Sequence, residues 1–321
     1  MKEALKGVGR ELLKQLTDAG LRYFGVQEAN RLGGRTTAAT TMLLGRLVKA
    51  GWVVRIERGR YAVLPEDGSG LNPLAVGREL AGGENYYISH GSAMEVWGMG
   101  EMQTYPRPFP SGKGGAIGGE KEAPAGTYPQ PLPEGRGEKQ EGVIVVLTDA
   151  PLRGCCANRK LPRREVLGTP YRFVRDNLLG LERLENRKAR PEHWRLVEVE
   201  IAPGEFVWVS DPEWTILSGL ARPDLCGGIE GVTRWVRRWR ERLDLEKLVK
   251  YANHIRNRTA VRRLGYVLEA LGLHTEESEF VLRFSVFSSY GRLEPGKPAA
   301  GDLYRKWRLD VNTDLTTDED F

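Results

Sequence analysis

The sequence contains few of the residues that build disulfide frameworks or metal centres. Its 321 residues include three cysteines and four histidines. Cys155 and Cys156 are adjacent and Cys226 is distant, a spacing that fits neither paired disulfides nor a zinc cluster. The histidines are scattered without the intervals typical of metal ligands. We therefore expect no metal site, and a reducing cytoplasm is the expected compartment.

Long apolar runs are also missing. No stretch of about eighteen apolar residues occurs, so we expect no membrane-spanning segment. The opening sequence MKEALKGVGRELLKQL places acids among its apolar positions, which predicts no secretory signal. A chain with 40% hydrophobic and 28% charged residues has the composition of a globular protein with a sizeable core. Its length predicts two or more domains.

The most informative stretch runs from Arg35 to Pro65. Thr36 or Thr37 can cap a helix, because a threonine hydroxyl accepts a hydrogen bond from a first-turn backbone N–H group. Gly51 is placed to end this helix in a left-handed conformation. Residues 52–56 and 61–64 then predict two short strands joined by the tight turn Glu57-Arg58-Gly59-Arg60.

Two further helices are predicted upstream, over residues 8–19 and 26–32. Three helices followed by a two-stranded ribbon with a basic tip are typical of a winged helix-turn-helix. Its third helix can lie in a major groove, while arginines of the ribbon reach phosphates. The fold class that we expect is α+β: an N-terminal winged helix-turn-helix followed by a larger mixed α/β C-terminal domain.

Local charge favours double-stranded DNA as the partner of this N-terminal segment. Residues 1–64 carry twelve Lys/Arg and five Asp/Glu, a surplus of +7 against +5 for the whole chain. The alternative interpretation is a small structural α+β unit that binds nothing. The candidate DNA-binding residues are Arg35, Thr36, Thr37, Thr41, Arg46, Lys49, Arg58 and Arg60. Threonines at base edges would make modest contacts, either hydrogen bonds or contacts with a thymine methyl group.

The remaining chain divides by composition. We expect a winged-helix domain over 1–65, and a turn-rich linker with the helical start of the C-terminal domain over 66–102. Residues 103–142 are dense in Gly and Pro and predict an insertion or long loop. Its glycines do not form a nucleotide-binding loop, because Lys113 is followed by glycine and not by Ser or Thr. The C-terminal domain then covers 143–321.

Within 143–321 strands are predicted first and helices afterwards. The strands are expected near 143–147, 171–174, 194–201 and 205–209, with a Pro203-Gly204 turn between the last two. Glu198 and Glu200 share one strand face, which we interpret as a solvated face and not as an acid–base pair. Helices follow over 210–272, and shorter strands are predicted at 284–287 and 307–312.

Several motifs resemble one family when they are taken together in order. They are RGRYAVLP after the ribbon, ISHGSAMEVWGM, VSDPEWTILSGLARPDLCGGIEGV, LEKLVKYANHIRNRTAVRRLGYVLEALGL and KWRLDVN. The chain resembles the AbiEi abortive-infection antitoxins of bacterial type IV toxin–antitoxin systems. The resemblance covers most of the chain except roughly 103–142.

The resemblance implies an antitoxin that represses its own operon by binding inverted repeats through the winged helix. It implies neutralisation of a nucleotidyltransferase-type toxin without a stable complex, and neither a catalytic residue nor a cofactor. The span 234–263 holds eleven Lys/Arg and three Asp/Glu, and its arginines suit phosphate or carboxylate partners. The candidate antitoxicity surface is Arg256, Arg258, Arg262 and Arg263. Solvated arginines without a partner are the equal alternative.

Two other functions stay open at this point. One is a stand-alone winged-helix transcriptional regulator whose C-terminal domain senses a ligand or forms oligomers. The other, less favoured, is an enzyme that acts on nucleic acid through Glu198, Glu200 and the basic helices. An adjacent gene for a nucleotidyltransferase would favour the antitoxin.

Overall fold

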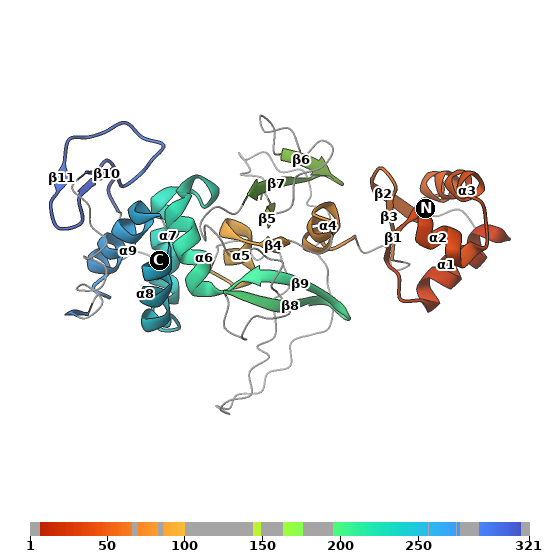
Figure 1. The fold of residues 1–321 in the computed structure, drawn as a ribbon, viewed down its shortest axis with the longest axis horizontal. Helices are drawn as coiled ribbons and strands as arrows, with labels where there is room; N and C mark the ends of the chain where they lie inside the picture. The colour runs from red at the N-terminus through yellow and green to blue at the C-terminus, as the bar shows by residue number, and fades with distance from the viewer. Residues whose placement is uncertain are drawn as a thin grey trace, which may run out of the picture.

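A computed structural model describes residues 7–65, 70–82, 86–99, 144–148, 163–175, 195–255, 257–273, 275–276 and 289–315. Across these residues the chain has the expected α+β class. Three groups of elements follow one another along the long axis of the molecule: an N-terminal unit, a central sheet and a set of C-terminal helices (Figure 1). The predicted insertion at 103–142 and the predicted strand at 284–287 lie outside the described residues.

The N-terminal unit contains three helices and a small antiparallel sheet. Its strands lie in the order β1-β3-β2. The predicted helices and ribbon are confirmed to within about two residues, whereas β1, only three residues long, was missed. In chain order the elements are α1 (Val8–Asp18), β1 (Tyr23–Gly25), α2 (Val26–Gly33), α3 (Thr37–Lys49), β2 (Val53–Glu57) and β3 (Arg60–Val63).

Local sequence explains how α3 and the ribbon begin and end. The Thr36 hydroxyl accepts a hydrogen bond from the backbone N–H of Ala39 at 3.4 Å and caps α3. Gly51 follows the helix with φ 75°, and Gly59 occupies the tip of the β2–β3 turn with φ 82°, so both predicted glycine roles are confirmed. The apolar face of α3 contributes Leu44 and Leu47 to a buried core with α1 and the sheet.

A six-stranded mixed sheet forms the middle of the molecule, in the order β6-β7-β5-β4-β9-β8. β4 runs antiparallel to β5 and parallel to β9, while β8 and β9 form the predicted hairpin around Gly204. β6 was not predicted. The elements of this part are α4 (Pro73–Leu80), β4 (Tyr86–Ile88), α5 (His90–Val96), β5 (Ile144–Thr148), β6 (Arg163–Val166), β7 (Thr169–Arg175), β8 (Leu196–Ala202) and β9 (Glu205–Ser210).

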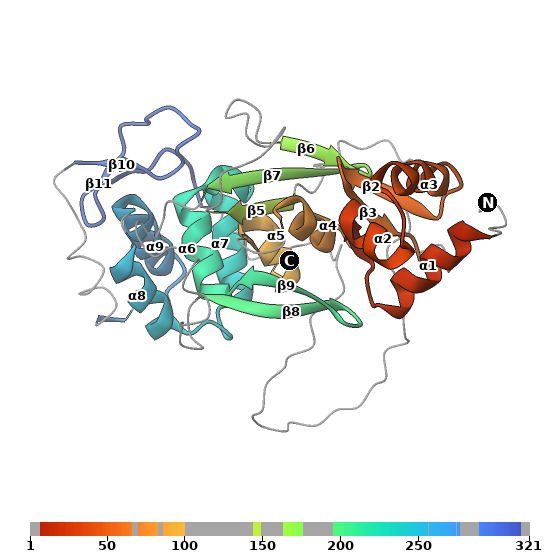
Figure 2. The ribbon, with the colours of Figure 1, turned by 45° about the vertical axis from the view of Figure 1, so that its right-hand side comes forward.

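The N-terminal unit shares apolar core with the sheet. Ile56 of β2 and Ala62 of β3 belong to one buried cluster with Leu74 and Ala75 of α4 and with residues of the sheet. In two views β2 and β3 lie between α3 and the sheet, with α4 beside them (Figures 1 and 2). The two sides therefore pack directly on each other, although residues 66–69 between them are not described.

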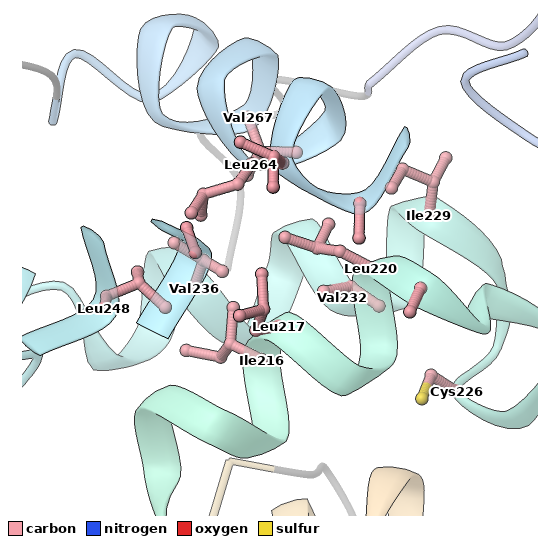
Figure 3. Packing of buried hydrophobic residues seen from close by; sticks show 14 of the residues in the cluster. Ile216, Leu217, Leu220, Cys226, Ile229, Val232, Val236, Leu248, Leu264 and Val267 are labelled. Carbon is pink, nitrogen blue, oxygen red and sulfur yellow. The ribbon is translucent and has the colours of Figure 1, made fainter. Parts of the chain in front are cut away.

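The C-terminal part is built from helices that surround an apolar core. These helices are α6 (Pro212–Ala221), α7 (Gly228–Trp239), α8 (Leu245–His254) and α9 (Arg258–Ala270), with a short 3-10 helix at Pro223–Leu225. Figure 3 shows Leu217 and Leu220 of α6 directed toward Leu264 of α9. A small sheet of β10 (Gly291–Arg292), β12 (Leu309–Asp310) and β11 (Leu303–Tyr304) follows. The strand predicted over 307–312 is thus only two residues long.

Asp211 joins the sheet to these helices. It follows β9 and caps α6, because its carboxylate accepts from the Trp214 backbone N–H at 2.7 Å. The same carboxylate accepts from the Tyr251 hydroxyl at 2.7 Å and pairs with Lys247 at 3.1 Å. The Arg195 guanidinium stacks over the Trp214 ring, 4.4 Å from its centroid. The Asp211 carboxylate therefore connects the end of β9 to α6 and α8, while Arg195, just before β8, packs on α6.

Two helix-interior glycines differ sharply in the space around them, and this difference predicts opposite effects of an added methyl group. A Cβ on Gly265 would lie 2.4 Å from the Trp307 ring, whereas a Cβ on Gly45 would meet nothing within 4 Å. Gly45→Ala should stabilise the protein by up to about 1 kcal/mol through helix propensity. Gly265→Ala should destabilise it by about 1–3 kcal/mol, since Trp307 must move. Urea unfolding followed by circular dichroism measures both, and equal effects would contradict the packing described here.

Candidate nucleic-acid interface

The outward face of α3 is the first part of the candidate interface. Thr40, Leu44 and Leu47 are buried, so the opposite side of the helix faces solvent. In both views α3 lies on the side of the N-terminal unit away from the central sheet (Figures 1 and 2). Seven of the eight predicted DNA-binding residues are exposed here or at the β2–β3 turn: Arg35, Thr36, Thr37, Thr41, Arg46, Lys49 and Arg58.

The cations on this outward side have no acidic partner among the described residues. Neither an ion pair nor a side-chain hydrogen bond joins Arg35, Arg46, Lys49 or Arg58 to another described residue. Arg35 lies just before α3, Arg46 and Lys49 lie in its last turns, and Arg58 lies in the turn of the ribbon. They frame the exposed helix face with positive charge that the described part of the protein does not neutralise.

The cations on the inward side are paired. Arg22 binds Glu205 of β9 at 2.7 Å, and Arg78 of α4 stacks 5.2 Å from the centroid of the Tyr23 ring while donating to the Phe206 carbonyl at 2.9 Å. Burial next to the Glu205 carboxylate raises the pKa of Tyr23 far above its ordinary value, so its hydroxyl stays protonated. The N-terminal unit thus has a neutralised face toward the sheet and an unneutralised face away from it.

Arg60 belongs to the inward group, which differs from the predicted role in contacting phosphate. Its guanidinium donates to the Glu79 carboxylate at 2.6 Å and lies 3.9 Å from Glu28. Glu79 is only 6% exposed and also binds Arg78 at 3.0 Å. Arg60 therefore holds the ribbon against α4. Nineteen residues separate Arg60 from Glu79, and no local pattern in the sequence indicated this contact.

An open hollow of about 410 Å³ lies between the β2–β3 turn and the start of α2. It is lined by acids and bases of both elements, among them Glu28, Arg31, Glu57 and Arg58. Glu28 also accepts from the Gly25 backbone N–H and so occupies the N-terminus of α2. With its helix N-terminus filled by a carboxylate, the hollow is poorly suited to a free anion.

The predicted antitoxicity surface is corrected by the structure. Arg262 and Arg263 are buried, at 3% and 4% exposure. Arg262 donates to the Ser289 carbonyl at 2.7 Å, and Arg263 donates to the carbonyls of Leu220 at 2.7 Å and Arg292 at 2.9 Å. These hydrogen bonds connect α9 to α6 and to the residues around β10. Arg258 is half-buried at the start of α9, and Arg256 lies outside the described residues.

The remaining candidate sites give no constellation suited to catalysis within the described ranges. Glu198 and Glu200 are both exposed on β8, as the solvated-face interpretation expects, and Glu200 accepts from the Gly204 backbone N–H at 2.9 Å. In the described part of the chain, no group of three or more His, Cys, Asp or Glu side chains could hold a metal ion. Cys226 is buried, and burial raises the pKa of its thiol far above the ordinary value, which keeps it unreactive.

No protein-family model matches the chain, and no curated protein matches it. The resemblance to AbiEi antitoxins therefore depends on the motifs alone. Among the described residues, none of the helices combines the length and apolarity needed to cross a membrane.

The buried position of Arg263 predicts a structural role that an exposed arginine does not have. Burial lowers the pKa of Arg263 to about 10, and the guanidinium satisfies two carbonyl groups. Arg263→Met should leave these acceptors without donors and lower the free energy of unfolding by about 2–4 kcal/mol. The matched control is Arg240→Met, at an exposed position, which should change it by less than about 0.5 kcal/mol. Urea denaturation of both variants is the measurement, and equal stability would contradict the assignment.

Proposed function

We propose that the N-terminal unit is a winged helix-turn-helix and that it binds double-stranded DNA through α3 and the β2–β3 turn. The observation that carries this proposal is the division of cations into two sets. Arg22, Arg60 and Arg78 are paired on the inward side, while the cations around α3 have no acidic partner in the described chain. An exposed helix framed by unneutralised positive charge matches the phosphates that border a major groove.

The roles of the individual cations follow from their positions. α3 is thirteen residues long, and its ends carry Arg35 on one side and Arg46 with Lys49 on the other, so both ends can meet phosphates while the middle faces bases. Arg58 at the tip of the turn is placed to contact the neighbouring backbone. Arg60 supports the interface indirectly, because its ion pair with Glu79 fixes the ribbon to α4, and we do not propose that it contacts a phosphate.

We further propose that the full chain is an antitoxin that represses its own operon and neutralises a nucleotidyltransferase-type toxin. The support is the order and spacing of the motifs that resemble AbiEi antitoxins, together with the proposed DNA-binding unit. The functional surface for neutralisation does not include Arg262 and Arg263, which are buried. A stand-alone regulator without a toxin partner is the alternative, and the identity of the adjacent genes separates the two.

The DNA-binding proposal predicts a steep dependence on salt. Each phosphate contact should contribute about 0.9 to the slope of log affinity against log salt concentration. Arg58→Ala in the full chain should weaken binding to duplexes of any sequence and reduce that slope by about one. Fluorescence anisotropy with a labelled duplex between about 50 and 200 mM salt measures both quantities.

Arg240→Ala is the matched control, because it removes an exposed cation at the end of α7, far along the chain from the interface. It should leave affinity and slope unchanged. Absence of duplex binding at low salt would disprove the proposal, and so would a binding constant independent of salt.

The antitoxin proposal predicts that neutralisation is separable from repression. Full-length protein with Arg46, Lys49 and Arg58 changed to alanine should fail to repress a reporter driven by its own promoter, yet still restore growth of cells that express the adjacent toxin from another promoter. If the wild-type protein also fails to restore growth, the antitoxin role is contradicted. Loss of rescue only in the triple variant would show that neutralisation requires DNA binding.

A further inference from the structure

Met42 occupies the centre of the outward face of α3. It is 65% exposed, more than the other large apolar side chains described as exposed. Ala38 precedes it by one helical turn and Gly45 follows it three residues later, so all three lie along the same side of the helix, and all are exposed. The side chain that projects farthest from the middle of this face is therefore apolar and flexible.

The threonines of this region already use their hydroxyl groups inside the protein. The Thr36 hydroxyl accepts from the Ala39 backbone N–H, and the Thr37 hydroxyl accepts from the Asn30 side-chain amide at 2.9 Å. The Thr41 hydroxyl donates to the Thr37 carbonyl at 2.8 Å. Each of these bonds uses one hydrogen-bonding position of a threonine hydroxyl, and all three threonines are exposed.

Side chains that form bidentate hydrogen bonds with bases are missing from the middle of this helix. Between Arg35 and Arg46 the sequence TTAATTMLLG contains no Asn, Gln, Arg, Lys, His, Asp or Glu. The bidentate pairs that distinguish guanine and adenine in the major groove require such side chains. Apart from single hydrogen bonds of threonine hydroxyls, direct readout by the centre of α3 therefore consists of apolar contact, and the apolar group that a major groove presents is the C5-methyl group of thymine.

We propose that the duplex bound by α3 is recognised at its central positions through thymine methyl groups, with Met42 as the specificity-determining residue and the Thr41 methyl beside it. This inference rests on the proposed DNA-binding function and names the feature of DNA that the site reads. The flanking Arg35, Arg46 and Lys49 orient the helix through phosphates. A protein partner fits less well, because an apolar centre bordered by unneutralised cations is complementary to a polyanion.

Replacement of thymine by uracil isolates this contact. Uracil keeps the hydrogen-bonding edge, base pair and phosphates of thymine and removes only the methyl group. The probe is a duplex enriched by the full chain from a pool of random sequences, prepared once with thymine and once with uracil. Each methyl group lost from an apolar contact should weaken binding about fourfold, the transfer free energy of one buried methylene group expressed as a ratio.

Variants of Met42 assign the effect. Met42→Ala should bind the thymine and uracil duplexes with nearly equal affinity, while Met42→Leu, which keeps an apolar side chain of similar size, should preserve most of the preference. Val8→Ala removes apolar atoms from the exposed surface of α1 and is the matched control, with an unchanged preference expected. Met42 packs into no core, so all three variants should keep the thermal stability of the wild type.

The outcomes distinguish this inference from the function on which it rests. Absence of binding to any duplex at low salt removes the proposed function itself. Enriched duplexes bound equally well with thymine or uracil overturn the methyl readout and leave DNA binding intact. A Met42→Ala variant that keeps the thymine preference also overturns the methyl readout. So does a Met42→Ala variant that changes the oligomeric state of the protein but not its DNA preference, because Met42 would then belong to a contact between copies of the chain.

Discussion

The packing of the β2–β3 ribbon on α4 determines how the candidate interface is presented. Ile56 and Ala62 point from the ribbon into the same buried cluster as Leu74 and Ala75. Around this apolar contact, Arg60 is bound by the nearly buried Glu79, and Arg22 by Glu205. Because the back of the ribbon is fixed in this way, α3 and Arg58 are held in one orientation relative to the sheet.

Burial separates the arginines of this protein into two kinds, those that bind groups of the protein itself and those that face solvent. Burial of a guanidinium is costly unless its donors are satisfied, and Arg263 satisfies its own with the backbone carbonyls of Leu220 and Arg292. Arg262 donates to the Ser289 carbonyl, while its buried Nε has no hydrogen-bond partner among the described residues. An exposed guanidinium has no such requirement, because water satisfies it. A run of basic residues in a sequence therefore contains both structural and partner-binding arginines, and only the neighbouring elements separate them.

Local patterns allowed the N-terminal helices, the ribbon and most strands of the sheet to be predicted. Thr36, Gly51 and Gly59 act within a few residues of themselves, so their roles are visible in the sequence. The pairing of Arg60 with Glu79 and the burial of Arg263 depend on residues 19 to 43 positions away, and the sequence carries no sign of them. β1 and β6 escaped prediction because neither has a pattern typical of a strand: β1 (YFG) runs directly into α2, and β6 (RREV) has a single apolar residue.

The exposed face of α3 has a consequence for how the protein can change over evolutionary time. Ala38, Met42 and Gly45 are exposed and belong to no core cluster, whereas Leu44 and Leu47 on the opposite side pack in the core and Thr40 is buried. Substitutions on the exposed face alter what the helix recognises without altering whether it folds. On the proposed function, the preferred DNA site can therefore drift together with this face, while the scaffold that presents it stays unchanged.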